Sequence, residues 1–287
     1  MMTHTKAPAA IIIRDIELVQ EMRAVERLQK EVWGCDELEV LPLTFMRASR
    51  EVGAILVGAF AEDELVGFAY GFVGLEDGRL VVHSDMLAVK PEYRGCGLGI
   101  RLKLAQRERA IALGIESMTW TFDPLQSRNA HLNFARLGVV SHRYEIDFYG
   151  AQTSSFLHRN IGTDRLWVRW PLLSERVRQR LAAQQSPAAS LVQLERLPRL
   201  VRLQTDGTPL RIELHKAPAQ SDALIEIPCD ISLLQEERAE LARSWRLATR
   251  GAFKEALAAG YAVAEFYRLS RQGQSLGAYL LSLDKNI

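Results

Sequence analysis

The N-terminal part of the chain alternates short apolar runs, which are typical of strands, with stretches in which apolar residues recur at helical spacing. The strand-type runs cover residues 11–16, 54–60, 65–73, 83–89, 117–122, 139–148 and 165–172. The helix-type stretches cover residues 18–32, 42–53, 100–113 and 128–137. The predicted order is therefore β-α-α-β-β-β-α-β-α-β-β, which indicates an α+β fold with a mixed central sheet flanked by helices.

Local signals refine this pattern. Asp15 and Ser127 are residues that often cap helices, and each is expected to cap the helix that follows it. Gly67 stands inside a strand, where a glycine indicates a bulge or the close approach of another backbone. The pair Asp77–Gly78 predicts a hairpin turn into the next strand.

The pattern changes after residue 172. We predict an N-terminal domain at 1–172, a helix and linker at 173–190, and a smaller accessory α+β domain at 191–287. In the accessory domain, strands are expected at 223–227, 262–269 and 276–283, and a helix is expected at 233–259 with a break near Arg250–Gly251.

The order helix, glycine, strand, polar turn, strand occurs twice, at 45–72 and at 253–283, with Gly67 and Gly277 in corresponding places. A degenerate half-repeat of the first domain explains this recurrence, and so does chance reuse of a common unit. The second copy contains no glycine-rich phosphate loop, so we expect the accessory domain to support the first domain's site and to hold no second cofactor.

Composition and charge exclude several classes of function. The 287 residues carry 36 basic and 35 acidic side chains, a net charge of +1, which gives no electrostatic basis for nucleic-acid binding. The apolar run Ile11–Ile13 is far too short for a membrane span or a signal sequence, so no membrane partner is expected. Three widely spaced cysteines match neither a disulfide framework nor a metal site, which favours the reducing cytoplasm.

The most informative stretch lies between the strand at 83–89 and the following helix. It reads Arg94-x-x-Gly97-x-Gly99, with a further glycine at position 95. A glycine-rich turn into a helix exposes backbone N–H groups at the positive end of the helix dipole, which suits a phosphate. Ile100 stands where a dinucleotide-binding loop needs its third glycine, and the lysine of a P-loop is absent.

This loop resembles the acyl-CoA pyrophosphate loop of the GNAT superfamily of N-acyltransferases, and the predicted order of elements is similar to that family's over roughly residues 10–172. The resemblance implies acetyl-CoA or another acyl-CoA as the cofactor. It also implies that the loop holds the pyrophosphate and that the strand backbone near the thioester polarises its oxygen. The implied cofactor-binding residues are Leu87, Ala88, Val89, Arg94, Gly95, Cys96, Gly97, Leu98, Gly99 and Ile100.

An amine acceptor must lose a proton, which requires a base within reach. By the resemblance, Asp85 is the first candidate, because many family members carry an acidic residue four positions before the one that matches Val89. If the strand is regular, residues 83, 85, 87 and 89 share a face, so His83 is the second candidate. The alternative is that Asp85 only forms hydrogen bonds with backbone beside the strand.

Family members often have a general-acid tyrosine at the position that matches Phe134, and a phenylalanine cannot donate a proton. Tyr144 and Tyr149, on the next strand, are candidate replacements, although strand tyrosines more often serve packing. Asn129 and Asn133 are four residues apart on one expected helix face, where they could hold the pantetheine amides or the acceptor. Helix capping and a solvent-exposed face are the alternatives for these two asparagines.

The sequence thus favours an enzyme that transfers an acetyl or another short acyl group from acyl-CoA to the amino group of a small molecule, with amino acids among the candidates. Two alternatives stay open: a non-catalytic module that binds or senses acyl-CoA, for which Phe134 is the best argument, and a peptide or protein N-acyltransferase. A homodimer is compatible with the apolar strands of the accessory domain, whose edges need a partner.

Overall fold

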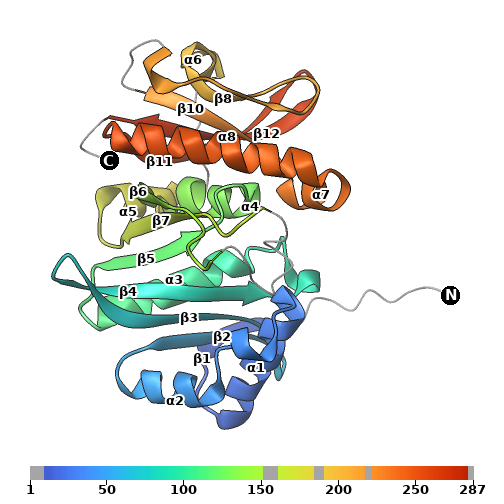
Figure 1. Cartoon of the computed structure of the whole chain (residues 1–287). Helices are drawn as coiled ribbons and strands as arrows, with labels where there is room; N and C mark the ends of the chain where they lie inside the picture. Colours follow the sequence, from blue (N-terminus) through green and yellow to red (C-terminus); the bar gives the residue numbers. More distant parts are fainter. Residues whose placement is uncertain (1–9, 151–160, 184–190, 217–221, 284–287) are drawn as a thin grey trace. The chain divides into compact units, whose positions relative to one another are not determined.

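The computed structural model describes residues 10–150, 161–183, 191–216 and 222–283 (Figure 1), so residues 184–190 of the predicted helix and linker lie outside the described residues. Its secondary structure mixes helices and strands throughout, and the predicted α+β class is confirmed. The chain forms two compact units that meet inside one strand, the first running to Thr119 and the second starting at Trp120. The functional boundaries at 172 and 190 stay a prediction.

The first unit is built on a mixed sheet in the order β1-β2-β3-β4-β5. Its strands are β1 (Ile11–Asp15), β2 (Ile55–Ala61), β3 (Glu64–Glu76), β4 (Arg79–Val89) and the first residues of β5 (Ser117–Phe122). The pairs β1–β2, β2–β3 and β3–β4 are antiparallel, and β4 and β5 are parallel. Asp77 and Gly78 form the predicted hairpin turn with φ of 51° and 74°, as a two-residue turn of this hand requires.

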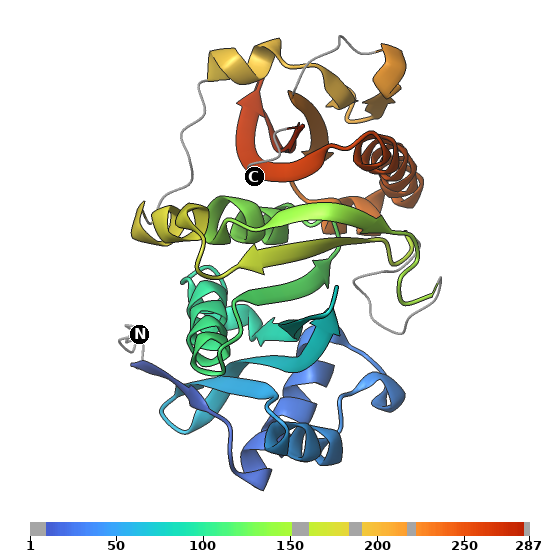
Figure 2. The same ribbon diagram turned by 90° about the vertical axis from the view of Figure 1, so that its left-hand side faces the viewer.

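Helices cover both faces of this sheet. They are α1 (Val19–Trp33), α2 (Leu43–Glu51) and α3 (Leu98–Ala112), with 3-10 turns at Glu37–Glu39 and Pro91–Tyr93. Figure 2 shows α3 on one face and the α1–α2 pair on the other. Met22 of α1 and Met46 of α2 join Phe68 and Tyr70 of β3 in one buried apolar core. Because α3 packs on one face of the sheet, the position of its N-terminus is fixed.

The start of α1 differs from the prediction. The proposed cap at Asp15 is wrong, because β1 extends through Asp15, whose carboxylate forms an ion pair with Arg109 of α3. The carboxylate of Glu21 serves the helix start instead. It accepts hydrogen bonds from the N–H groups of Glu17 at 3.1 Å and Leu18 at 3.2 Å.

The second unit also has a mixed sheet, in the order β7-β6-β11-β12-β10-β8-β9. Its strands are β6 (Val140–Glu145), β7 (Arg165–Pro171), β8 (Arg199–Leu203), β9 (Pro209–Arg211), β10 (Asp222–Pro228), β11 (Ala262–Arg271) and β12 (Gln274–Ser282). Only β8 and β10 pair in parallel among its described ladders. The strands β8 and β9 were not expected from the sequence, because β8 has arginines among its apolar residues and β9 is only three residues long.

The helices of the second unit are α4 (Ser127–Ala130) with a following π-helical segment (His131–Leu137), α5 (Glu175–Ala183), α6 (Leu191–Arg196), a 3-10 turn (Leu214–Lys216), α7 (Ile231–Glu237) and α8 (Ala239–Ala258). The expected cap at Ser127 is wrong, because Gln126 takes that place. The helix break predicted at Arg250–Gly251 is also wrong and lies at Arg238. At Gly251, a Cβ would lie 2.5 Å from Cζ of Arg211, so the guanidinium group of Arg211 packs over this glycine.

Candidate functional site

The loop between β4 and α3 has the geometry of an anion site. Gly95 and Gly97 have φ of +85° and +80°, a region that favours glycine, and a Cβ on Gly95 would meet nothing within 4 Å. Gly97 is the N-cap of α3, and its carbonyl accepts the N–H of Arg101 at 3.2 Å. The N–H groups of Leu98, Gly99 and Ile100 precede that bond in the first turn of the helix. Backbone N–H groups at a helix N-terminus suit a pyrophosphate.

Short contacts hold this loop against the end of β4. Arg94 donates from Nε to the carbonyl of Val89 at 3.1 Å, and Cys96 donates from Sγ to the carbonyl of Tyr93 at 2.9 Å. Leu98 is buried and anchors the start of α3, whereas Arg94, Gly95, Cys96 and Gly97 are all exposed. The loop therefore presents bare backbone and one exposed guanidinium group, a donor set that fits the pyrophosphate of an acyl-CoA.

A bulge in β4 changes which side chains share a face. The β3–β4 register shifts between Tyr70 and Phe72. Gly71 stands opposite the shift, where a Cβ would lie 2.9 Å from the His83 carbonyl oxygen and 3.2 Å from Cα of Ser84. A side chain at Gly71 would therefore collide with the bulged backbone.

The expectation that residues 83, 85, 87 and 89 share a face is wrong as a result. The ring of His83 packs against Phe72, with centroids 5.4 Å apart, and Phe72 in turn lies against Tyr70 of the α1–α2 face. The side chain of Val89 instead contacts the α3 face beside Leu102, at the point where Gly67 approaches the Ala88 carbonyl. The predicted close approach at Gly67 is confirmed.

The described pairing of β4 with β5 ends next to the bulge. The described pairs between β4 and β5 are Val82 with Met118 and His83 with Thr119, whereas β3 pairs with β4 as far as Val89. Within the described ladders, the edge of β4 that faces away from β3 is thus left open over residues 84–89. This stretch contains Leu87, Ala88 and Val89, the residues predicted to lie at the thioester.

Asp85 has a distinctive environment. Its side chain is accessible to solvent, and within the described residues its carboxylate forms no hydrogen bond or ion pair. Desolvation by the surrounding protein raises its pKa above the ordinary value. A carboxylate that is reachable, unpaired and of raised pKa is suited to take a proton from a ligand.

His83 differs from Asp85. Its Nδ1 lies 3.0 Å from Oγ1 of Thr119, and burial together with the positive charge of Lys103 lowers its pKa to about 4. The imidazole is therefore neutral at neutral pH and already bonded to a neighbour. Of the two candidate bases, only Asp85 is without a hydrogen-bond partner in the described residues.

Behind the bulge lies a buried polar group that sequence reasoning missed. Lys103 donates from Nζ to Oγ of Ser84 at 2.7 Å, and Ser84 donates to Oε1 of Gln106 at 2.7 Å. Burial lowers the pKa of Lys103 to about 7. The sequence signal was the occurrence of Lys103 and Gln106 beside the apolar positions of α3. Because Ser84 is part of the bulge, these contacts fix the backbone beside Asp85.

The candidate acids lie in the second unit. Tyr144 donates its hydroxyl to Oδ2 of Asp164 at 2.5 Å and stacks on Phe253, and burial raises its pKa. Phe134 is fully buried with its ring against Tyr279. Tyr149 is exposed, with its hydroxyl 3.2 Å from Oγ1 of Thr121. The role of Tyr144 as an acid stays a prediction. The hydrogen bond to Asp164 argues against it, because the hydroxyl proton is already shared with that carboxylate.

The two asparagines do not share an environment. Asn129 lies in α4 and is exposed, whereas Asn133 is buried and accepts a hydrogen bond from Nε1 of Trp120 at 3.3 Å. The expected common face is wrong, because the helix becomes π-helical at His131 and residues four apart no longer align. Their assignment as cofactor contacts stays a prediction, and Asn129 is the more accessible of the two.

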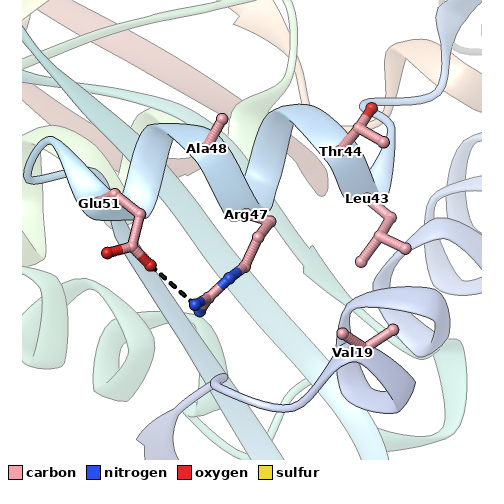
Figure 3. A pocket seen from close by; sticks show the side chains of 6 residues that line it. All are labelled: Val19, Leu43, Thr44, Arg47, Ala48 and Glu51. Atoms are coloured by element: carbon pink, nitrogen blue, oxygen red, sulfur yellow. Dashed lines mark ion pairs between the residues drawn. The ribbon is translucent and has the colours of Figure 1, made fainter.

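A surface pocket of about 420 Å³ lies beside α1 and α2 (Figure 3). It is lined mainly by aliphatic groups such as Val19 and Leu43, and its charged residues Arg47 and Glu51 pair with each other at 2.9 Å. None of the residues discussed above lines this pocket. Among the described residues, no group of His, Cys, Asp and Glu side chains is placed to hold a metal ion. No described helix is long and apolar enough to cross a membrane.

Comparison with known proteins gives a family match for part of the chain. Residues 19–139 match the family model described as the acetyltransferase (GNAT) family. The match begins with α1 and ends after the π-helical segment, so it contains β4, the glycine loop and α3. GNAT acetyltransferases use an acyl-CoA donor, so acetyl-CoA or another acyl-CoA is the cofactor that this match implies. No curated protein matches the chain.

Several solved structures are similar to it at low sequence identity. The ribosomal-protein-S18-alanine N-acetyltransferase from Escherichia coli is 14% identical, with 57% of this chain and 94% of that chain covered and a TM-score of 0.45. Ard1 from Thermoplasma volcanium is 15% identical, with 58% and 100% covered and a TM-score of 0.44. The yncA protein from Salmonella typhimurium, solved with acetyl-CoA, is 16% identical, with 63% and 100% covered and a TM-score of 0.46.

Proposed function

Because residues 19–139 are a GNAT-family acetyltransferase domain, we propose that this protein transfers an acetyl or another short acyl group from acyl-CoA to the amino group of a small molecule. Amino acids are one candidate class of acceptor. The observation that carries the proposal is Asp85, an accessible carboxylate of raised pKa that has no partner in the described part of the chain and lies on the strand that leads into the glycine loop.

The donor would be held by the loop and by β4. The N–H groups of Leu98, Gly99 and Ile100, with the guanidinium of Arg94, would bind the pyrophosphate. The open edge of β4 near Leu87 would orient the acyl group and stabilise the negative charge that develops on its oxygen. Holding donor and acceptor together supplies much of the rate, because a bimolecular encounter becomes effectively unimolecular.

The acceptor amine must be neutral to attack. Asp85 takes the proton from the ammonium form, directly or through one water molecule, and its raised pKa makes it a stronger base than an ordinary carboxylate. Bound acyl-CoA supplies the activated acyl thioester. The bulge that Gly71 permits and Ser84 anchors fixes the backbone beside this carboxylate.

Protonation of the leaving thiolate has no assigned residue. Phe134 carries no acidic proton, and the hydroxyl of Tyr144 is bonded to Asp164. A coenzyme A thiolate can leave unprotonated and take its proton from water, so turnover does not require an acid at either of these two positions. The lack of an available acid at these two positions is also the observation that favours the alternative of a non-catalytic acyl-CoA-binding module.

The decisive experiment follows thiol release with acetyl-CoA and a pool of free amino acids and polyamines, and identifies the product by its gain in mass. Saturable thiol release with an acylated small amine supports the proposal. Acyl-CoA binding without release would favour the sensing module, and modification of peptides alone would favour a peptide or protein N-acyltransferase.

We place the protein in the cytoplasm, because its three cysteines, Cys35, Cys96 and Cys229, are all free, as is typical of a reducing compartment.

We propose that residues 191–287 have an accessory role, since the described part of this segment contains strands and helices but no second glycine loop into a helix.

A further inference from the structure

Arg246 in the second unit is a buried cation with one donor group unused. Only 2% of its side chain is exposed. Its Nε donates to the carbonyl of Ile161 at 3.0 Å, and its Nη2 donates to Oδ2 of Asp123 at 2.7 Å. Its Nη1 is buried and has no hydrogen-bond partner among the described residues. A buried donor on a charged group is costly when it is left unpaired, so this Nη1 points to a missing acceptor.

Arg246 also lines a pocket of about 290 Å³. Two further arginines of α8, Arg243 and Arg250, line the same pocket together with Leu247. Asp147 is the one carboxylate of the lining, and its Oδ2 lies 3.8 Å from Nη2 of Arg250. The residues that line this pocket therefore include three arginines and one carboxylate.

The nearby carboxylates already accept hydrogen bonds from other groups. Asp164 accepts both Nε and Nη2 of Arg250, at 2.8 and 2.7 Å, and also the hydroxyl of Tyr144. Asp123 accepts Nη2 of Arg246 and the N–H of Leu125. Glu240, which pairs with Arg243 at 3.1 Å, does not line the pocket.

We propose that this pocket is a binding site for a small oxyanion group, a carboxylate or a phosphate. The oxygen atoms of the anion would accept from Arg243 and, after a small turn of the Arg246 side chain towards the pocket, from its Nη1, while Arg250 stays paired with Asp164. Guanidinium groups match the planar, multiple acceptors of such anions better than ammonium groups do. The pocket is large enough for the anionic end of a metabolite.

The ligand has two possible sources, a free anion or the anionic group of the acceptor. The site itself is defined by residues of the second unit alone, so the proposal stands whether or not the proposed acyl transfer is correct. Direct binding measurements therefore test it separately from activity.

Binding is measured on the full chain by calorimetry and thermal unfolding with sodium phosphate and sodium acetate, against sodium chloride at equal ionic strength. Leu247→Glu places a carboxylate in the lining, at a side chain that is 57% exposed, so the fold should be retained. Leu233→Glu on α7 is the matched control, since Leu233 is 50% exposed and does not line the pocket.

We expect phosphate or acetate to bind the wild type and the Leu233→Glu variant, and Leu247→Glu to weaken binding at least about tenfold, because like charges repel and the new carboxylate takes the free donors. Arg243→Gln should weaken binding in the same direction. Equal binding to Leu247→Glu and wild type, or no anion binding beyond the chloride reference, overturns the proposal.

Kinetics separate the two sources once an acceptor is known. If the bound anion is part of the acceptor, phosphate raises the KM of the acceptor without changing kcat. If the site serves a free anion, phosphate leaves that KM unchanged while it still binds with the same affinity.

Discussion

The hydroxyl of Tyr279 donates a 2.7 Å hydrogen bond to the carbonyl of Pro124, which lies 155 positions earlier in the chain. Pro124 follows β5, whereas Tyr279 lies on β12. The Tyr279 ring is fully buried, with edge contacts to Phe134 and Phe253. The C-terminal strands therefore complete a core that begins with the residues after β5.

Tyr279→Ala should remove a large part of this core. We expect a loss of about 3–5 kcal/mol in the free energy of unfolding, as for other large-to-small substitutions of buried aromatic residues. Tyr279→Phe keeps the ring but leaves the Pro124 carbonyl without its partner, so we expect a loss of about 1–3 kcal/mol. Denaturant unfolding of both variants tests the order, and equal losses would show that the ring packing is unimportant.

A chain that ends at residue 186 should not form a stable second unit. Truncation removes β11, which pairs with β6, and it removes the rings of Phe253 and Tyr279 that cover Tyr144 and Phe134. Exposed strand edges and aromatic groups favour aggregation. We expect a poorly soluble protein that binds a hydrophobic dye. A truncated protein that is monomeric and fully active would show instead that residues 187–287 are dispensable for folding and activity.

Gly97→Glu should abolish CoA binding while the protein stays folded. A Cβ at this position meets only Ile100 Cγ2 at 3.9 Å, so there is space for a side chain, and the added carboxylate repels the pyrophosphate. The φ of +80° costs about 1–2 kcal/mol of stability for a residue with a Cβ.

Gly114→Glu is the matched control, because Gly114 has a φ of +74°, open space around it and a place at the far end of α3. It should carry the same strain and charge and bind CoA normally in calorimetry. If both variants bind CoA equally well, the cofactor assignment of the loop is wrong.

Asp85→Asn should lower the turnover rate at neutral pH about a hundredfold or more, because an amide cannot accept the proton. The wild-type rate should rise with pH through a pKa above the ordinary 3.8, and this limb should vanish in the variant. Asp63→Asn, in the exposed turn before β3, is the control and should leave both unchanged. Should Asp85→Asn keep a near-normal rate while His83→Asn does not, the base is His83.

The same substitution should not lower stability at pH 7. Because desolvation raises the pKa of Asp85 in the folded state, its stabilising contribution is present below pH 3.8 and is lost as the pH rises through the folded-state pKa. At pH 7 the ionised carboxylate therefore carries a cost that the amide lacks. We expect an equal or higher free energy of unfolding for Asp85→Asn, together with its lower activity.

Lys103→Met should change how stability depends on pH. Burial lowers the pKa of Lys103 from 10.5 to about 7, so its contribution is present above pH 10.5 and is lost as the pH falls towards 7. The wild type should thus gain stability relative to Lys103→Met between pH 7 and 10.5, by about 1.4 kcal/mol for each unit of pKa shift. Lys254→Met, at an exposed site on α8, should show no such gain. Parallel curves for Lys103→Met and wild type would contradict a buried lysine.

The sequence by itself determined the order of elements through β7 and the position of the glycine loop. Both are local properties: apolar periodicity fixes a helix or strand within its own residues, and Gly95 and Gly97 allow positive φ whatever surrounds them. Residue-level details at the ends of elements were less predictable, as the caps wrongly placed at Asp15 and Ser127 show, because a neighbouring strand or turn competes for the same residues.

Only the tertiary structure decided which side chains meet. The bulge at Ser84 depends on the missing side chain of Gly71 across the ladder, and it interrupts the alternation of side chains along β4 at Ser84 and Asp85. The burial of Lys103 and the partners of Tyr144 likewise come from residues remote in sequence. Periodicity reports the face a residue occupies in a regular element. A register shift, or a contact between residues more than a hundred positions apart, does not change the periodicity of the sequence. The energy of such a feature comes from atoms that only folding brings together.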